Sequence, residues 1–231
     1  MKCYKKICDT LPPIAGVANA AMVLLDGLFA RMPYEKFAKT LKPKVDGTAF
    51  LDELFPKNTL DFFILFSSLA YVAGNIGQTP YAAANAFMVS LAEGRRKRGL
   101  AGSVMNLAGV FGVGYISRTD KAIHDRLGSM GYGHISEWDC HQFMAEAVLA
   151  SHPDSGMNFE ISNGMRHFNP ERDTDLPFWI DIPRFAKYKV IKADAASGKS
   201  DKRTVSVKAQ LKEQTTEEGV HEVLLSMYFS G

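Results

Sequence analysis

Short apolar runs alternate with longer amphipathic stretches along most of the chain. Runs of strand length occur at Ile14–Ala20, Leu60–Phe66 and Ser103–Leu107, and Leu60–Phe66 is too uniformly apolar for a half-exposed strand. Apolar residues at helical spacing follow in Tyr34–Leu54 and Tyr81–Arg98. This order predicts an α/β fold with a parallel sheet and flanking helices.

Local signals predict where the elements end. Pro43 predicts a break inside the first helix, and a basic cluster at 95–98 followed by Gly99 predicts the end of the second. A further amphipathic helix is predicted at Ser136–Ser151 and a last strand at Asn158–Ser162. We interpret the basic cluster as a solvated helix end and not as a nucleic-acid patch, because no aromatic residues are interleaved with it.

Composition changes near residue 190 and suggests a division of the chain. Lys192–Arg203 is small, polar and charged, which is the composition of a linker. Helical spacing returns from Thr204 onward. We therefore expect one α/β domain in residues 1–190, a linker in 191–203 and the start of a second domain in 204–231.

Overall composition favours an ordinary globular protein. Hydrophobic residues make up 46% and charged residues 23% of the chain, and the net charge of +2 predicts neither a nucleic-acid nor a membrane partner. The longest apolar stretches are too short to span a bilayer. Three cysteines without C-x-x-C spacing, and histidines without metal-ligand spacing, predict no disulfide framework and no metal site, and favour a cytoplasmic location.

Four polar residues have a spacing that brings them to one place. Ser68 ends a buried strand, and Tyr81 begins a helix thirteen residues later. Asn85 lies one helical turn after Tyr81, and Lys44 lies in the preceding helix, 24 residues before Ser68. Because ligands bind at the carboxyl ends of strands in open α/β sheets, these side chains are expected to converge there.

The segment FILFSSLAYVAGNIGQTPYAAANAFM, which contains Ser68, Tyr81 and Asn85, resembles the ketoreductase domains of polyketide synthases, a branch of the short-chain dehydrogenase/reductases. Most short-chain dehydrogenases have a lysine four residues after the tyrosine, whereas this sequence has Asn85 there and a lysine upstream, Lys44 in the segment PKVDG. This arrangement resembles the exchange of Lys and Asn positions in the polyketide synthase branch. Three further segments resemble fungal highly reducing synthases, including those fused to peptide synthetase modules: GVGYISR, HISEWDCHQFMAEAV and LPFWIDIPRF. The resemblance extends from Leu11 to Phe185, and the tail from Thr204 resembles the start of an acyl-carrier domain.

The resemblance implies a partial Rossmann-like fold and an NADPH-dependent reduction. Tyr81 would donate a proton to the keto oxygen of a β-ketoacyl thioester held on an acyl carrier, while Ser68 hydrogen-bonds the same oxygen. Lys44 would lower the pKa of Tyr81, and Asn85 would position Lys44 or an ordered water. The partners implied are the acyl carrier and the other domains of a polyketide synthase.

The resemblance also implies where the cofactor binds. Gly16, Asn19 and Ala20 fall in the family's cofactor-side loop, although this sequence has N-A-A-M where the family has H-A-A-G, with departures at Asn19 and Met22. Gly109 and Val110 match the nicotinamide-side loop. Only one acid, at position 26, remains of the L-D-D pattern that marks one stereochemical type, so the product configuration is not assigned.

The family's T-G-x-x-x-G-x-G phosphate loop belongs well before Gly16, and only fifteen residues precede it. We therefore expect the N-terminal half of the fold to be missing from this chain. Three hypotheses remain open: a ketoreductase-domain fragment, a catalytically inactive remnant or interaction fragment, and a complete small reductase with an unusual cofactor site.

Overall fold

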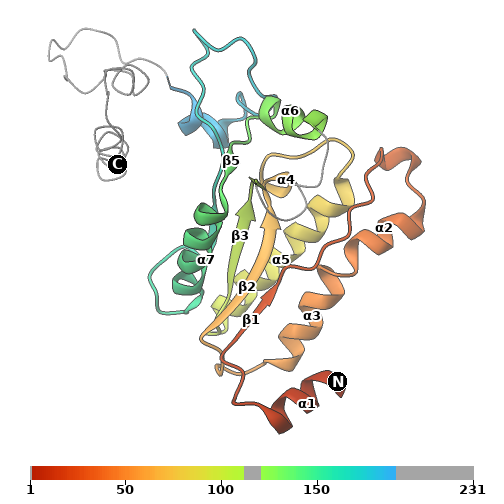
Figure 1. The fold of residues 1–231 in the computed structure, drawn as a ribbon, viewed down its shortest axis with the longest axis vertical. Coiled ribbons are helices and arrows are strands. Elements are labelled where there is room, and N and C mark those ends of the chain that lie inside the picture. Colours follow the sequence, from red (N-terminus) through yellow and green to blue (C-terminus); the bar gives the residue numbers. More distant parts are fainter. Residues whose placement is uncertain (1, 112–120, 191–231) are drawn as a thin grey trace, which may run out of the picture. The chain divides into compact units, whose positions relative to one another are not determined.

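A computed structural model of the chain describes residues 2–111 and 121–190 (Figure 1). The predicted linker 191–203, the predicted carrier-domain start 204–231 and the segment GVGYISR lie outside the described residues. The helices and strands, in chain order, are α1 Lys2–Thr10, β1 Gly16–Asn19, η1 Phe29–Arg31, α2 Tyr34–Leu41, α3 Val45–Leu54, β2 Phe62–Ser68, α4 Leu69–Val72, α5 Thr79–Lys97, β3 Ser103–Leu107, β4 Gly109–Val110, α6 Lys121–Ser129, β5 His134–Ile135, α7 Glu137–Ser151, β6 Glu160–Ser162 and η3 Pro183–Tyr188.

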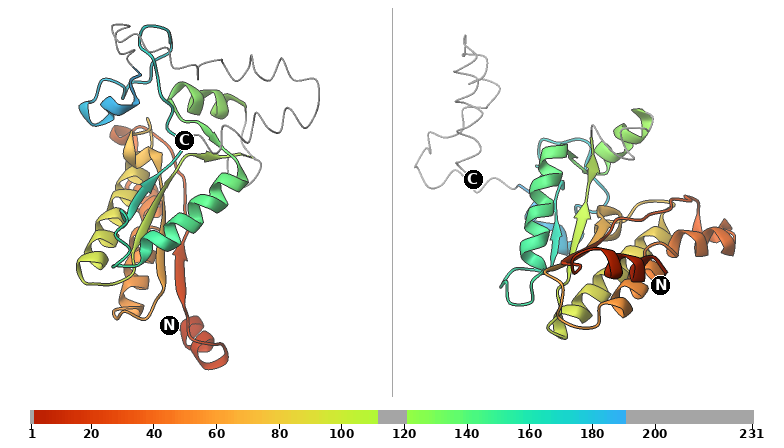
Figure 2. Two further views of the ribbon diagram at one scale, coloured as in Figure 1. Left: turned by 90° about the vertical axis from the view of Figure 1, so that its left-hand side faces the viewer. Right: turned by 60° about the horizontal axis from the view of Figure 1, so that its bottom comes forward.

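The strands form a parallel sheet with the order β1-β2-β3-β6, and β4 and β5 pair separately, also in parallel. Helices α3 and α5 lie on one side of the main sheet and α7 on the other (Figure 2). The fold is thus α/β with a parallel sheet and flanking helices, as the alternation of apolar runs predicted.

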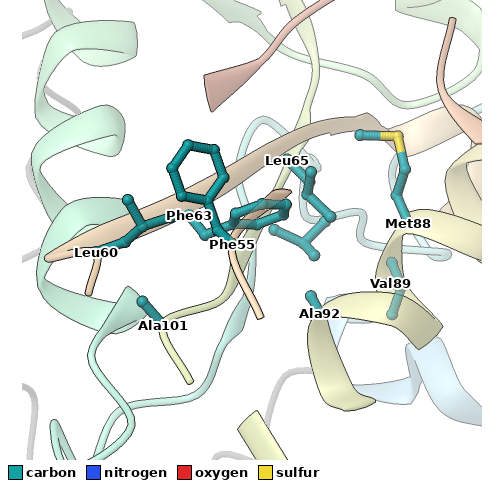
Figure 3. Close-up of a cluster of buried hydrophobic side chains, with 9 residues drawn as sticks. Phe55, Leu60, Phe63, Leu65, Met88, Val89, Ala92 and Ala101 are labelled. Atoms are coloured by element: carbon teal, nitrogen blue, oxygen red, sulfur yellow. The ribbon is translucent and has the colours of Figure 1, made fainter. Parts of the chain in front are cut away.

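Strand β2 is buried on both faces, which explains its uniformly apolar sequence. Phe63 and Leu65 point toward α5, where they pack against Met88 (Figure 3). Ile64 belongs to a second cluster, with Phe143 of α7. Because successive side chains in a strand point to opposite faces, a strand between two helical layers needs apolar residues at every position.

The second predicted strand is displaced by two residues from its predicted range. Leu60 is buried in the core but lies before β2, which begins at Phe62 and continues through Ser67 and Ser68. Those two serines pair with Asn106 and Leu107 of β3. The apolar pattern identifies the buried residues, whereas the strand ends where backbone pairing ends.

Helix ends follow the local signals. The break between α2 and α3 falls at Lys42–Lys44, as Pro43 predicted. Helix α7 begins with a capping box: the Ser136 hydroxyl accepts a hydrogen bond from the Asp139 amide at 3.1 Å, and the Asp139 carboxylate accepts one from the Ser136 amide at 2.8 Å. Gly99, with φ +71°, follows the end of α5.

The basic end of α5 is exposed at Lys97 and Arg98, as predicted, but not at Arg95. Arg95 is fully buried, and its guanidinium donates hydrogen bonds to Asp52 at 2.6 Å and to the carbonyls of Phe55 and Ala101. It also lies 4.0 Å from the centre of the Phe63 ring. The sequence around Arg95 does not show this burial, because the partner carboxylate is that of Asp52 in α3, 43 residues earlier.

A third cluster joins segments that are far apart in the chain. Trp179 is fully buried against Phe168 and Phe185, and its indole N–H donates to the Met130 carbonyl at 2.7 Å. Leu69 of α4 belongs to the same cluster. The segment LPFWIDIPRF therefore packs against the start of α4, beside the carboxyl end of β2.

Candidate functional site

A pocket of about 370 Å³ opens at the carboxyl ends of β1, β2 and β3. Its lining combines a few polar side chains with many apolar ones. The lining residues are Ala20, Met22, Leu24, Asp26, Lys44, Phe66, Ser67, Ser68, Leu69, Ala70, Asn75, Gln78, Tyr81, Leu107, Ala108, Gly109, Val110, Arg126, Leu127, Tyr132 and Cys140. The structure thus brings Lys44, Ser68 and Tyr81 to one pocket.

Tyr81 lies in the first turn of α5 and is 8% exposed. Its hydroxyl donates to the sulfur of Met22, at an Oη–Sδ distance of 3.9 Å. The ammonium of Lys44 lies 5.3 Å from the centre of the Tyr81 ring. The phenol is therefore the polar end of an otherwise apolar part of the pocket.

Ser68 occupies the junction between β2 and α4. Its hydroxyl oxygen accepts a hydrogen bond from the Ala70 amide at 3.1 Å, so Ser68 is the N-cap of α4. A hydroxyl that accepts in this way still has its own proton to donate. Capping therefore fixes the position of Ser68 while leaving it a donor for a ligand oxygen.

Lys44 lies at the N-cap of α3, in the break between α2 and α3. The prediction that it lies within a helix is therefore wrong. The residue is 2% exposed, and its ammonium donates to the Phe66 carbonyl at 2.5 Å. Burial lowers the pKa of Lys44 to about 8, because a buried ammonium loses its hydration. Lys44 thus spans from the helical layer to the end of β2.

The pKa of Tyr81 is raised above its ordinary value of 10, contrary to our expectation that Lys44 would lower it. Burial of the phenol is the largest cause, and the charge of Asp26 acts in the same direction. Asn85 and Ser68 are close enough to favour the phenolate and partly oppose burial. Desolvation therefore outweighs the neighbouring donors, and the phenol is held in its protonated form.

Asn85 is fully buried beneath the pocket and does not line it. Within residues 2–111 and 121–190, neither polar atom of its amide has a hydrogen-bond partner of ordinary geometry. A buried amide without partners is costly, so this group marks a place where a water or a ligand atom would be stabilised.

The predicted cofactor-side residues divide into two groups. Ala20, Gly109 and Val110 line the pocket. Asn19 does not, because its amide donates to Thr48 at 2.9 Å and to the Pro43 carbonyl at 3.2 Å and so ties β1 to the α2–α3 junction beside Lys44.

Gly16 lies at the opposite end of β1 from the pocket. It pairs with Phe62, and a β-carbon on Gly16 would lie 2.1 Å from the Phe62 ring. The absence of a side chain at Gly16 is therefore explained by packing at the amino end of the strand.

Apart from Asp26, the side chains that form the rim of the pocket were not singled out in the sequence. Arg126 of α6 donates to Asn75, whose amide donates to Gln78, and Gln78 in turn donates to the Asp26 carboxylate at 3.0 Å. Nothing in the sequence links residues 26, 75 and 126, since the fold alone brings them together.

Tyr132 also lines the pocket and was not predicted. Its hydroxyl lies 2.9 Å from the Gly74 carbonyl, to which it donates, and 3.3 Å from that of Leu69. Burial raises its pKa well above the ordinary value, so the phenol stays a donor. Tyr132 thereby holds the segment that connects Ser68 to Tyr81.

Residues 2–111 and 121–190 contain neither a cluster of metal ligands nor a helix that could span a membrane. No group of three or more His, Cys, Asp or Glu side chains there could hold a metal ion. None of the helices in this part of the chain has both the length and the apolar character needed to cross a membrane.

Known proteins with similar sequence and structure define the class. Residues 1–111 match the family model of the KR (ketoreductase) domain. The structure resembles A-type ketoreductases from a modular polyketide synthase, with a TM-score of 0.65 and 26% identity over 81% of this chain and 40% of that one. The fold of the described residues is that of the ketoreductases of polyketide synthases.

Several relatives with similar sequence are fungal multidomain synthases. The chain is 58% identical over 220 residues to the hybrid PKS-NRPS synthetase buaA of Petromyces alliaceus, covering 95% of this chain and 6% of that protein. It is 47% identical over 204 residues to the highly reducing polyketide synthase milA of Cordyceps militaris, covering 87% of this chain and 8% of that protein. The chain thus spans less than a tenth of the length of these relatives.

Proposed function

We propose that this chain carries the proton-donating part of a ketoreductase site that reduces a β-ketoacyl thioester to the β-hydroxyacyl form. The observation that carries the proposal is the convergence of Ser68, Tyr81 and Lys44 in one pocket at the carboxyl ends of parallel strands. The match to the KR domain supports the same reaction. The implied partners are an acyl carrier that presents the thioester and the other domains of a polyketide synthase.

In this proposal each side chain has one task. Tyr81 donates its proton to the keto oxygen as the carbonyl carbon gains a hydride, and Ser68 hydrogen-bonds the same oxygen. Lys44, fixed on the Phe66 carbonyl beside the Tyr81 ring, places a positive charge next to the phenolate that forms. Asn85 stabilises a water that returns a proton to Tyr81.

NADPH is the hydride donor of the proposed reaction, and its nicotinamide would supply the hydride to the carbonyl carbon. The residues present fit that end of the cofactor. Ala20, Gly109 and Val110 give the pocket small and apolar walls beside the two hydroxyls, which suits a flat ring. Cofactor binding is part of the proposal and is tested with it.

The test titrates NADPH into the 231-residue chain and then follows NADPH oxidation with a β-ketoacyl thioester of N-acetylcysteamine. We expect the isolated chain, whose sequence contains no T-G-x-x-x-G-x-G loop, to turn over poorly, and we expect turnover when a segment with that loop is joined in frame before it. That turnover should fall about 10²–10⁴-fold in Tyr81→Phe, because a positioned general acid contributes that much. Tyr34→Phe is the matched control, since Tyr34 is 77% exposed and lies outside the pocket. Absence of turnover in the joined protein would reject the proposal in favour of a catalytically inactive remnant, whereas tight NADPH binding and Tyr81-dependent turnover in the isolated chain would favour a complete small reductase.

A further inference from the structure

The hydroxyl of Tyr81 is already engaged by a side chain. Its hydrogen bond to the Met22 sulfur, at 3.9 Å, is the one that this hydroxyl donates within residues 2–111 and 121–190. A thioether sulfur is a weak acceptor, and a phenol has a single proton. A ligand oxygen that receives this proton therefore competes for it with the Met22 sulfur.

We propose that Met22 is a specificity-determining residue, which caps the Tyr81 hydroxyl and competes for its proton with the group that Tyr81 protonates. The inference rests on the proposed function, since it concerns the same pocket. It adds a selection step that the hydroxyls alone do not supply. A ligand gains the Tyr81 hydrogen bond only if it can also replace the packing of the thioether.

Met22 is placed so that its side chain can leave without the backbone moving. It lies between β1 and η1, in a segment without regular secondary structure, and is 39% exposed. The segment is fixed before Met22 by the Ala21 amide, which donates to Asn19 at 3.1 Å, and after it by the Gly27 amide, which donates to the Gly77 carbonyl at 2.9 Å. The backbone is held at both ends, while the unbranched side chain retains its rotatable bonds.

The surroundings of the thioether indicate which ligands it admits. Met22 lines the pocket together with Leu24, Leu69 and Leu127, so a large part of the pocket wall is apolar. A carboxylate next to the carbonyl would lose its hydration there, which is costly. The favoured class is a ketone with uncharged, apolar substituents, and keto acids are disfavoured.

Charged groups around the pocket agree with this selection. The Asp26 carboxylate lines the pocket and repels an anionic ligand, and the ammonium of Lys44 is engaged by the Phe66 carbonyl. Arg126 is exposed at the rim, where its guanidinium donates to Asn75 and to the Ile76 carbonyl. Neither cation contacts Met22 in the hydrogen bonds that they form.

A titration tests the cap without requiring turnover. The chain is labelled with ¹³C at the tyrosine ζ carbon, and the Tyr81 resonance is identified by its loss in Tyr81→Phe. In Met22→Ala, water reaches the phenol, so the pKa of Tyr81 should fall toward its ordinary value. In Met22→Leu, which keeps the bulk, the pKa should stay raised. An unchanged pKa in Met22→Ala would overturn the inference.

A second measurement needs no change at Met22 in the measured protein. The ¹³C-methyl resonance of Met22, identified by its loss in Met22→Leu, should shift as Tyr81 ionises in the unmodified chain. The same resonance should not titrate over that pH range in Tyr81→Phe. A Met22 methyl that is insensitive to Tyr81 ionisation would contradict the contact.

Turnover rates with two substrates test the specificity role of Met22 separately from the proposed function. If the chain turns over, Met22→Ala should reduce the preference for an apolar ketone over a matched keto acid by about tenfold, while Met22→Leu retains it. An unchanged preference in Met22→Ala overturns the specificity role alone. Absence of turnover in the protein joined to a phosphate-loop segment rejects the proposed function, and the two NMR titrations still decide whether Met22 caps Tyr81.

Discussion

Lys44 and Arg95 are both buried cations, and their surroundings compensate them differently. Arg95 has a carboxylate partner, two carbonyl acceptors and an aromatic face. Lys44 has a carbonyl at 2.5 Å and a sulfur at 3.9 Å, and its pKa is lowered to about 8. Burial lowers the pKa of both cations, and at Arg95 the Asp52 carboxylate partly opposes this effect. Among the described residues, Lys44 has no such carboxylate partner, so more of the cost of burying its charge remains.

The stability of the chain should depend on pH through Lys44. Its folded pKa of about 8 lies below the ordinary value of 10.5, so the unfolded state binds more protons between those values. The cost of burying the ammonium is present in full below pH 8 and disappears as the pH rises toward 10.5. Over this range the advantage of Lys44→Met over the unmodified chain should shrink by about 3 kcal/mol, at about 1.4 kcal/mol per pH unit.

Urea unfolding of both proteins between pH 7 and pH 10.5 measures this difference. The Lys44→Met variant is the reference, because the difference in unfolding free energy between the two proteins removes the titrations that they share. A difference in unfolding free energy that stays constant across the range would contradict the assigned pKa of Lys44.

Helix α5 contributes to the pocket at its first turn and to the packing against α3 at its last turn. Its first turn places Tyr81 in the pocket, and its last turn places Arg95 against Asp52 of α3. The last turn also contacts the end of α7, because Arg96 donates to the carbonyls of Ala150 and Pro153. The position of Tyr81 thus depends on contacts made at the far end of the same helix.

Removing the buried end of α5 should destabilise the fold strongly. Arg95→Ala leaves the Phe55 and Ala101 carbonyls without their donor and opens a cavity, so we expect a loss of about 3–5 kcal/mol in unfolding free energy. The matched control is Lys97→Ala on the same helix turn, whose pair with Glu93 is exposed and should contribute less than about 1 kcal/mol. Equal losses in the two variants, measured by urea denaturation, would refute the anchoring role of Arg95.

Much of this arrangement could be predicted from the sequence, and the rest depended on contacts between distant segments. The spacing of apolar residues predicted the first and last residues of β3 and placed those of α5 within two residues. The spacing of Ser68 and Tyr81 predicted that both side chains line one pocket. Helices α1 and α4 were missed because α1 follows no strand signal and α4 is a single turn. The burial of Arg95 was missed because Asp52 lies 43 residues earlier.

At the scale of the whole molecule, the Trp179 cluster joins segments from three parts of the chain. Gly131 is at its centre, with φ +78°, and a β-carbon there would lie 2.6 Å from the Trp179 ring and 3.0 Å from that of Phe168. The adjacent Tyr132 reaches the candidate site through its hydroxyl. Packing around Trp179 therefore supports the wall of the pocket.

A pair of glycine variants separates this packing from backbone strain. Gly131 and Gly156 both have positive φ, but the space around Gly156 is open. Both Gly→Ala changes carry the conformational penalty, and Gly131→Ala also forces the rings apart, so it should cost about 1–3 kcal/mol more. The comparison is made by urea denaturation followed through tryptophan fluorescence, in which Trp179 reports the buried environment. Equal losses of unfolding free energy in the two variants would contradict this, because the rings of Trp179 and Phe168 would then move aside at no cost.

The order of strands across the main sheet, β1-β2-β3-β6, is also their order along the chain. Each new strand joins the edge that the previous strand has just formed, so no existing pair has to open to admit it. During synthesis the first pair can form once Ser68 has left the ribosome, the second after Leu107 and the third after Ser162. The described sheet can therefore grow vectorially, at the pace of translation and in one direction.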